Sequence, residues 1–227
     1  VAHSLDPEVI RSADSAFHPE GGIRLLEGNL GRSLIKTSAV APERQSMTAP
    51  AVVISDQQEL TALFEQGELD RDCVVVVRFQ GPAANGMPEL HQLMPILGVL
   101  QDRGYAIALV TDGRLSGASG KVPAAIHVTP EAAKGGSIGR IQDGDVISLD
   151  VATGELFVSL DDQTLADRPH PDTPTAKNTV GRGLFKFSRE VVTDAESGGC
   201  TLFEALVMDD LPQVEFVRNV AYEHCAS

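Results

Sequence analysis

Residues 73–79 read Cys-Val-Val-Val-Val-Arg-Phe, and this nearly continuous β-branched run decides the fold. A run without alternation is typical of a strand that is buried on both faces, as in a parallel sheet. Residues 106–110 (AIALV) repeat the pattern, and residues 89–103 between them form a helical segment that stops before Gly104. A strand, a helix and a second strand in this order predict a crossover that pairs the two strands in parallel.

The flanking segments extend this unit on its N-terminal side. Residues 34–37 and 51–54 have the β-branched content of strands. Ser55 is the expected N-cap of a helix that ends before Gly67. Pro95 predicts a kink or a late start in the helix of residues 89–103.

On the C-terminal side the pattern becomes antiparallel. Asp143-Gly144 and Thr153-Gly154 divide residues 138–160 into expected β-hairpins. Thr129-Pro130 predicts a short helix, and residues 183–192 have helical spacing. The sequence therefore predicts a mixed α/β body, parallel at its centre and antiparallel at one side.

Composition restricts the partners. The chain has 227 residues, 42% of them hydrophobic, and its 18 Lys and Arg against 32 Asp and Glu give a formal net charge of −14. This charge argues against nucleic acid and anionic membranes as partners. The longest apolar run, residues 73–77, is too short to cross a membrane, and no signal segment opens the chain, so we expect a cytoplasmic protein. Because Val1 is not a natural initiator, we expect the chain to begin at a boundary left by cloning or by processing.

Three cysteines, Cys73, Cys200 and Cys225, form neither a CxxC motif nor a spaced cluster. They cannot build a zinc site or a complete iron–sulfur ligand set by themselves. Cys73 lies in the apolar run and is expected in the core.

Two glycine-rich loops follow the two buried strands, at the edge where open α/β sheets place their ligands. The first is residues 81–90 (GPAANGMPEL) and the second is residues 111–123 (TDGRLSGASGKVP). Glycine lets backbone N–H groups approach an anion, and Glu89 offers a hard oxygen ligand for Mg²⁺. By themselves these residues indicate an anion or metal pocket, and an ordinary pair of turns is an equal alternative.

These loops, with residues 28–32 (GNLGR) and 125–131 (AIHVTPE), closely resemble the dehydratase superfamily that contains 6-phosphogluconate dehydratase, dihydroxy-acid dehydratase and the sugar-acid dehydratases. The phosphogluconate branch is the most similar, and the resemblance covers about residues 21–203. It implies a compact, barrel-like C-terminal domain of the swivelling, aconitase-like type with flanking helices. The expected organisation is a connecting arm (1–25) from a missing N-terminal domain, the dehydratase domain (26–203) and an unassigned tail (204–227).

The resemblance also implies roles for particular residues. Ser116 corresponds to the catalytic base of the family, and Glu89 to a Mg²⁺ ligand that acts with ligands from the missing domain. An iron–sulfur cluster, expected as 4Fe–4S, would be held entirely by that domain. The expected substrate-binding residues are Asn29, Arg32, Arg114, Gly117, Ser119 and Lys121.

The implied reaction converts 6-phosphogluconate to 2-dehydro-3-deoxy-6-phosphogluconate and water, a step of the Entner–Doudoroff pathway. The complete enzyme is expected to be a homodimer, and this chain by itself is expected to be inactive because it lacks the cluster ligands.

Structural alternatives stay open for each residue. Ser116 could be a turn serine, and Glu89 a helix N-terminal acid. Asp112 is expected to stabilise a turn rather than to act in catalysis. Arg114, Lys121, Asn29 and Arg32 could simply be solvated, whereas His127 is expected as a satisfied core histidine and His91 as a surface residue. Two other functions compete: a sister sugar-acid or dihydroxy-acid dehydratase, and a non-catalytic anion-binding module.

Overall fold

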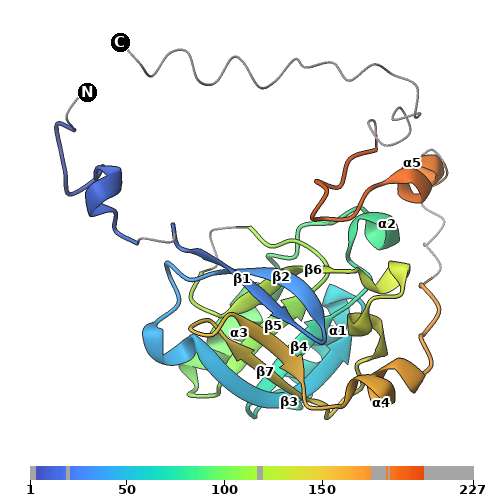
Figure 1. Cartoon of the computed structure of the whole chain (residues 1–227). Helices are drawn as coiled ribbons and strands as arrows, with labels where there is room; N and C mark the ends of the chain where they lie inside the picture. The colour runs from blue at the N-terminus through green and yellow to red at the C-terminus, as the bar shows by residue number, and fades with distance from the viewer. Residues whose placement is uncertain (1–3, 19–20, 117–119, 175–182, 184, 202–227) are drawn as a thin grey trace, which may run out of the picture.

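The computed structural model describes residues 4–18, 21–116, 120–174, 183 and 185–201. Within these residues the strands close a barrel in the order β1-β2-β6-β5-β4-β3-β7-β8, with helices around it (Figure 1). The expected barrel-like, mixed-sheet α/β fold with flanking helices is therefore confirmed. The strands are β1 (Ile23–Gly28), β2 (Gly31–Lys36), β3 (Ser46–Ile54), β4 (Cys73–Val77), β5 (Ile107–Thr111), β6 (Ala124–Thr129), β7 (Val146–Asp150) and β8 (Glu155–Val158).

The parallel part of the barrel is formed by β3, β4, β5 and β6. The pairs Val52↔Val75 and Val75↔Leu109 set the register at its centre. Val74 and Val76 belong to the core inside the barrel, whereas Val75 belongs to a second core between the barrel and the helices. Because both faces of β4 are covered, its sequence shows no alternation.

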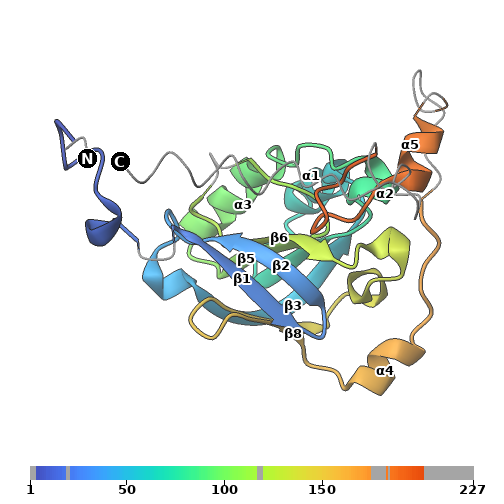
Figure 2. The ribbon, with the colours of Figure 1, turned by 45° about the horizontal axis from the view of Figure 1, so that its top comes forward.

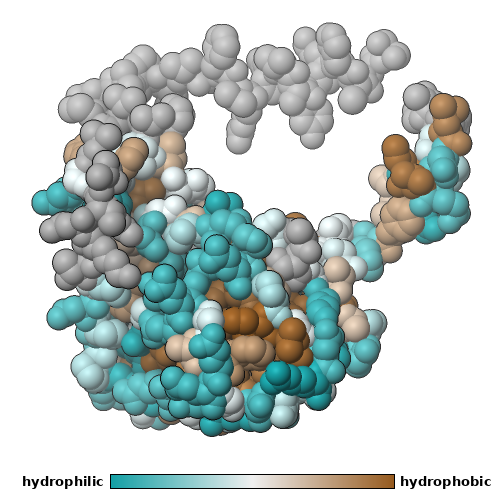
Figure 3. Space-filling model, turned by 180° about the vertical axis from the view of Figure 1, so that it is seen from behind, coloured by the Kyte–Doolittle hydropathy of each residue, from teal (hydrophilic) through white to brown (hydrophobic). Residues whose placement is uncertain are grey.

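Two helices cover the outer face of the parallel strands. Leu60 of α1 (Gln57–Glu65) and Leu97 of α3 (Leu93–Asp102) are fully buried and belong to the second core. Figure 2 shows α1 and α3 on the side of the barrel away from β1 and β8. Seen from that side (Figure 3), the body carries a hydrophobic area surrounded by hydrophilic side chains.

The N-cap of α1 differs from the sequence-based prediction by one residue. Asp56, not Ser55, has the extended backbone of a cap, and its side chain accepts a hydrogen bond from the Gln58 backbone N–H. Glu59 accepts a bond from the Ser55 backbone N–H at 3.2 Å, so the arrangement resembles a capping box. The carboxylate is the better acceptor at a helix N-terminus, where the dipole favours negative charge.

Pro95 was predicted to cause either a kink in the helix or a late helix start, and the structure shows the late start. The helix starts late, at Leu93, so Pro95 lies in its first turn, where a missing N–H costs no hydrogen bond.

The first glycine-rich loop contains an unexpected short helix, α2 (Pro82–Asn85), which ends at Gly86 in the left-handed conformation. The remaining short helices are η1 (Ala13–Ser15), η2 (Pro42–Arg44), η4 (Ala132–Lys134), η5 (Ser137–Arg140), α4 (Asp162–Asp167) and α5 (Lys186–Val191).

The antiparallel side contains fewer hairpins than the turn signals suggested. Thr153-Gly154 lies in the β7–β8 hairpin, as expected, but Asp143-Gly144 only leads into β7. Residues 138–140 belong to η5 rather than to a strand. The expected helix after Thr129-Pro130 is the 3₁₀ helix η4, and the one within residues 183–192 is α5.

The barrel closes between β1 and β8. β1 begins at Ile23, three residues inside the range assigned to the arm, and Glu27 pairs in parallel with Glu155. A Cβ atom at Gly28 would lie 1.9 Å from the Leu156 carbonyl oxygen, so this approach requires glycine. The preceding segment, residues 4–18, stands away from the barrel (Figure 1), and the expected tail lies outside the described residues.

Asp112 joins the loops at the carboxyl ends of the parallel strands. Its side chain is fully buried and accepts backbone N–H bonds from Gln80 (2.8 Å), Phe79 (3.1 Å) and Ala132 (2.9 Å). Burial raises the pKa of this carboxyl to about 6, with the three N–H donors acting in the opposite direction. The three N–H donors favour the ionised carboxylate, and their bonds hold the segments that follow β4 and β6 against it.

Replacing Asp112 should destabilise the fold strongly. Asp112→Asn places an amide N–H₂ against backbone donors, and each buried donor left without an acceptor costs roughly 1–3 kcal/mol. We expect a loss of at least about 2 kcal/mol in the free energy of unfolding at pH 7, measured by urea denaturation.

The matched control is Asp72→Asn. Asp72 also accepts one backbone N–H bond, from Ala106 at 2.8 Å, but it is exposed and an amide oxygen can replace it. The Asp72→Asn variant should lose no more than about 0.5 kcal/mol in the free energy of unfolding. Equal losses in the two variants would contradict the role given to Asp112.

Candidate active site

The two glycine-rich loops lie side by side because β4 and β5 pair in parallel. Val77 pairs with Thr111 at the carboxyl ends of these strands, so the segments that follow leave the barrel at the same edge. An isolated parallel bridge between Glu89 and Arg114 then joins the loops. This bridge brings together residues separated by 25 positions in the sequence.

Glu89 is the centre of this junction. One carboxylate oxygen accepts the Ser116 backbone N–H at 2.8 Å, and the other lies 3.1 Å from an Arg114 guanidinium nitrogen. Arg114 also donates from Nε to the Met87 carbonyl at 2.8 Å. The Glu89 side chain is 29% exposed, so solvent reaches a carboxylate that the two loops hold in place.

The first loop is anchored by a second buried carboxylate, Glu131. Its oxygens accept the backbone N–H groups of Ala83 (2.9 Å) and Ala84 (3.0 Å) at the start of α2. A Cβ atom at Gly81 would lie 2.4 Å from the Glu131 carboxylate. The glycine is therefore needed for the carboxylate to approach the helix, and sequence analysis gave no role to Glu131.

Ser116 is exposed and lies beside a surface pocket of ≈ 550 Å³. The Ser116 backbone N–H bonds Glu89, so the two residues are neighbours, while their catalytic and metal-binding roles stay predictions. Lys121 also lines the pocket, and its ammonium group contacts both Asp102 carboxylate oxygens at 2.7 Å. The pocket is lined by Ala39, His91, Met94, Pro95, Ser116, Gly120, Lys121 and Val122.

Asn29 and Arg32, which were also predicted to bind substrate, contact other parts of the chain. The Asn29 side chain bonds the backbone of β8, donating to Val158 O at 2.9 Å and accepting from Val158 N at 2.9 Å. Arg32 forms ion pairs with Glu27 (3.0 Å) and Glu196 (3.3 Å). The two hydrogen bonds of Asn29 join the β1–β2 turn to β8, so Asn29 has a structural role where the barrel closes. Gly117 and Ser119, which were also predicted to bind substrate, lie outside the described residues.

His127 lies close to this junction although it was expected as a core histidine. It is half-buried, adopts a left-handed backbone (φ 57°), and its N–H donates to Gly113 O at 2.9 Å. Burial and the charge of Arg114 lower the pKa of His127. A non-glycine residue in this conformation often marks a functional site, but sequence carries no signal for it.

Only part of the expected cofactor chemistry fits the described residues. Glu89 supplies one carboxylate with unused lone pairs, which suits a single Mg²⁺ ligand. In the described part of the chain, no group of three or more His, Cys, Asp or Glu side chains could hold a metal. Cys73 is fully buried in β4, as expected, and burial raises its pKa to about 11, which does not suit an iron ligand.

Comparison with known proteins identifies the family. Residues 8–199 match the family model of the dihydroxy-acid/6-phosphogluconate dehydratase C-terminal domain. The chain belongs to this family. It is 56% identical over 204 residues to phosphogluconate dehydratase of Pseudomonas aeruginosa, covering 89% of this chain and 34% of that protein. It is 57% identical over 203 residues to the Escherichia coli K12 phosphogluconate dehydratase, covering 88% of the chain and 34% of that protein.

More distant relatives have another named activity. A dihydroxy-acid dehydratase of Anaeromyxobacter dehalogenans is 35% identical over 201 residues, covering 87% of this chain and 35% of that protein. The chain thus spans about a third of the length of the curated relatives it matches. Among the described residues, no helix has the length and apolar character needed to cross a membrane.

Removing the charge of Arg114 should change the titration of His127. Because the Arg114 charge opposes protonation of the imidazole, Arg114→Gln should raise the His127 pKa towards its ordinary value of 6.5. The measurement is a pH titration of the histidine ring protons by NMR, with His127→Gln used to assign the signal. Arg103→Gln is the control, since Arg103 pairs with Asp70 instead. An unchanged His127 pKa in Arg114→Gln would contradict the inferred interaction.

Proposed function

We propose that this chain is the C-terminal domain of a phosphogluconate dehydratase and contributes the base and one metal ligand to a composite active site. The observation that carries the proposal is the Glu89 carboxylate, which bonds the Ser116 N–H and the Arg114 guanidinium beside an open pocket. The substrate is proposed to be 6-phosphogluconate, and the products 2-dehydro-3-deoxy-6-phosphogluconate and water. Identities of 50–57% to several phosphogluconate dehydratases, against 35% to a dihydroxy-acid dehydratase, favour the phosphorylated sugar acid.

In this reaction Ser116 Oγ would accept the proton from C2 of the substrate. The electron pair of the C–H bond forms the C2–C3 double bond, and hydroxide leaves C3 and takes up the proton carried by Ser116 to form water. The enol product then becomes the 2-keto acid by transfer of its hydroxyl proton to C3. A serine hydroxyl is a poor base at neutral pH, so its pKa must be lowered by nearby positive charge. We propose that Arg114, two residues away in the chain and paired with Glu89, supplies part of this charge. Mg²⁺ bound at Glu89 would increase the acidity of the C2 proton by withdrawing charge from the substrate carboxylate.

The partners and compartment are also proposals. Because the relatives are about three times as long, we propose that an N-terminal domain supplies the remaining metal ligands and an iron–sulfur cluster, with 4Fe–4S as the expected type. The complete enzyme is proposed to be a cytoplasmic homodimer of the Entner–Doudoroff pathway. Arg114 and Lys121, with Gly117 and Ser119 between them, are proposed to contact the substrate anion.

Removing the Ser116 hydroxyl should abolish turnover in the complete protein. Loss of a catalytic base lowers kcat by roughly 10²–10⁴-fold. Ser116→Ala should therefore lose turnover and solvent exchange of the C2 proton while substrate affinity is largely kept. Ser46→Ala, at an exposed serine of β3 that bonds Asp150, is the matched control and should retain activity. C2-proton exchange at the wild-type rate in Ser116→Ala would show that the base lies elsewhere.

The chain by itself should be inactive. Its described residues offer one carboxylate for a metal and no metal-binding cluster, so neither dehydration of 6-phosphogluconate nor iron–sulfur absorbance is expected. The measurement is a product assay after attempted cluster reconstitution, with the complete protein as a positive control. Turnover by the isolated chain would contradict the composite site.

A further inference from the structure

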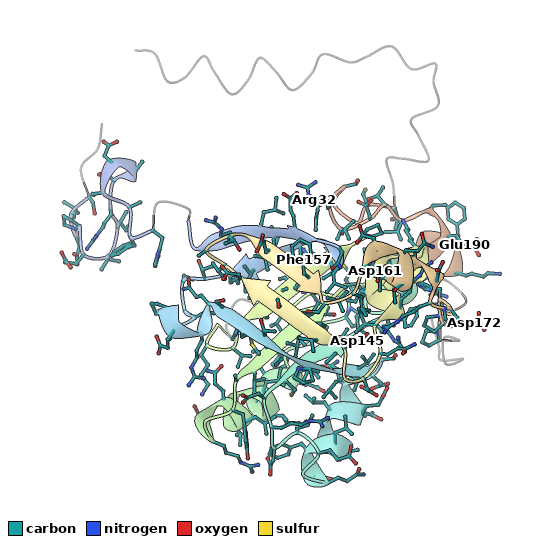
Figure 4. The ribbon with its side chains drawn as sticks, turned by 60° about the horizontal axis from the view of Figure 1, so that its bottom comes forward. Arg32, Asp145, Phe157, Asp161, Asp172 and Glu190 are labelled. Atoms are coloured by element: carbon teal, nitrogen blue, oxygen red, sulfur yellow. The ribbon has the colours of Figure 1, made fainter. Side chains whose placement is uncertain are left out.

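A second pocket of ≈ 400 Å³ shares no lining residue with the pocket beside Ser116 and uses none of the residues proposed for catalysis. We propose that this pocket binds a small oxyanion, a phosphate or carboxylate group, through Arg78 and Arg140. In Figure 4, Asp145, which accepts the backbone N–H of the lining residue Gln142, lies apart from Arg32 on the β1–β2 hairpin. The pocket is lined by Val53, Arg78, Gly139, Arg140, Ile141, Gln142, Asp143, Pro169 and Pro171.

Arg78 is held in the wall of this pocket. It directly follows β4, and one of its terminal guanidinium nitrogens donates to Gly139 O (2.8 Å) and Ile141 O (3.2 Å). Its Nε is buried and has no hydrogen-bond partner. Burial lowers the pKa of Arg78, and the negative charges of Asp143 and Glu59 oppose this shift only in part.

Arg140 is the second cation of the pocket and has the same unfulfilled bonding. One of its terminal nitrogens donates to Ala166 O at 2.7 Å, and its Nε is also buried without a partner. Arg168 donates to the Arg140 carbonyl oxygen and is itself paired with Asp145 at 2.9 Å, so it holds this segment in place. Within the described residues, neither Arg78 nor Arg140 forms a salt bridge.

The charge balance of the pocket favours an anion. Two arginines line it against one carboxylate, Asp143, in a chain whose formal net charge is −14. Asp143 already accepts the Val53 backbone N–H at 2.7 Å, so part of its bonding capacity is used. Half-buried guanidinium groups that form no salt bridge are suited to bind phosphate and carboxylate. The volume falls within the range of small-ligand sites, roughly 300–1,000 Å³.

The test is an NMR titration of the ¹⁵N-labelled chain with inorganic phosphate, at constant ionic strength maintained with chloride. Saturable shifts of the backbone amides of residues 139–143 are expected. An acetate titration compares carboxylate with phosphate: similar affinity would identify a general oxyanion site, and weaker affinity a phosphate site.

Three variants test the charge argument. Arg140→Gln removes a proposed ligand and should weaken phosphate binding by about tenfold. Gln142→Glu adds a negative charge at an exposed lining residue and should weaken binding, even if Arg140→Gln does not fold. Asp143→Asn keeps an oxygen for the Val53 N–H but removes the one negative charge among the described lining residues, so it should strengthen binding.

Lys121→Gln is the control for binding near Ser116 and should leave the shifts of residues 139–143 unchanged. The proposal is overturned if these shifts do not saturate, if they occur only around Ser116, or if Gln142→Glu and Asp143→Asn bind phosphate with wild-type affinity. Shifts in this pocket with an acidic peptide but not with phosphate or acetate would also overturn it. They would identify a protein-binding surface instead. None of these outcomes depends on dehydratase activity.

Discussion

The buried carboxylate of Asp112 is the constraint on which the rest of this structure depends. It accepts three backbone N–H groups, from Phe79, Gln80 and Ala132, which belong to segments far apart in the chain. These donors come from the ends of β4 and β6, so one side chain fixes how both segments leave the barrel. Phe79 adopts a left-handed backbone (φ 62°) where it meets this carboxylate, a conformation that local sequence would not favour.

The acidic residues around these loops fall into two groups, buried carboxylates and one partly exposed carboxylate. Asp112 and Glu131 are almost completely buried, and their oxygens satisfy backbone donors of the loops. Glu89 uses the same kind of contact with the Ser116 N–H but keeps part of its surface exposed. The buried carboxylates thus hold the loops through backbone N–H groups, while the Glu89 carboxylate keeps part of its surface open to solvent.

The end of β4 also connects the two proposed binding places. Arg78 lines the second pocket, and the next residue, Phe79, donates its backbone N–H to Asp112. The acidic chain therefore places local positive charge in two separate positions, Arg114 at the Ser116 loop and Arg78 with Arg140 at the other pocket. Net charge alone predicts neither position, because a small anion responds to the charges within a few ångströms.

The sequence by itself determined the parallel strands, the two loops that follow them and the family. Continuous apolar runs report burial on both faces, and the loop motifs around Glu89 and Ser116 are long enough to be recognised. Tertiary structure decided the barrel closure at Gly28, the use of Asn29 at that seam, and the positions of Glu131 and His127 near the site. These features depend on contacts between segments distant in sequence. A local sequence pattern does not indicate which backbone groups a carboxylate or amide side chain will contact.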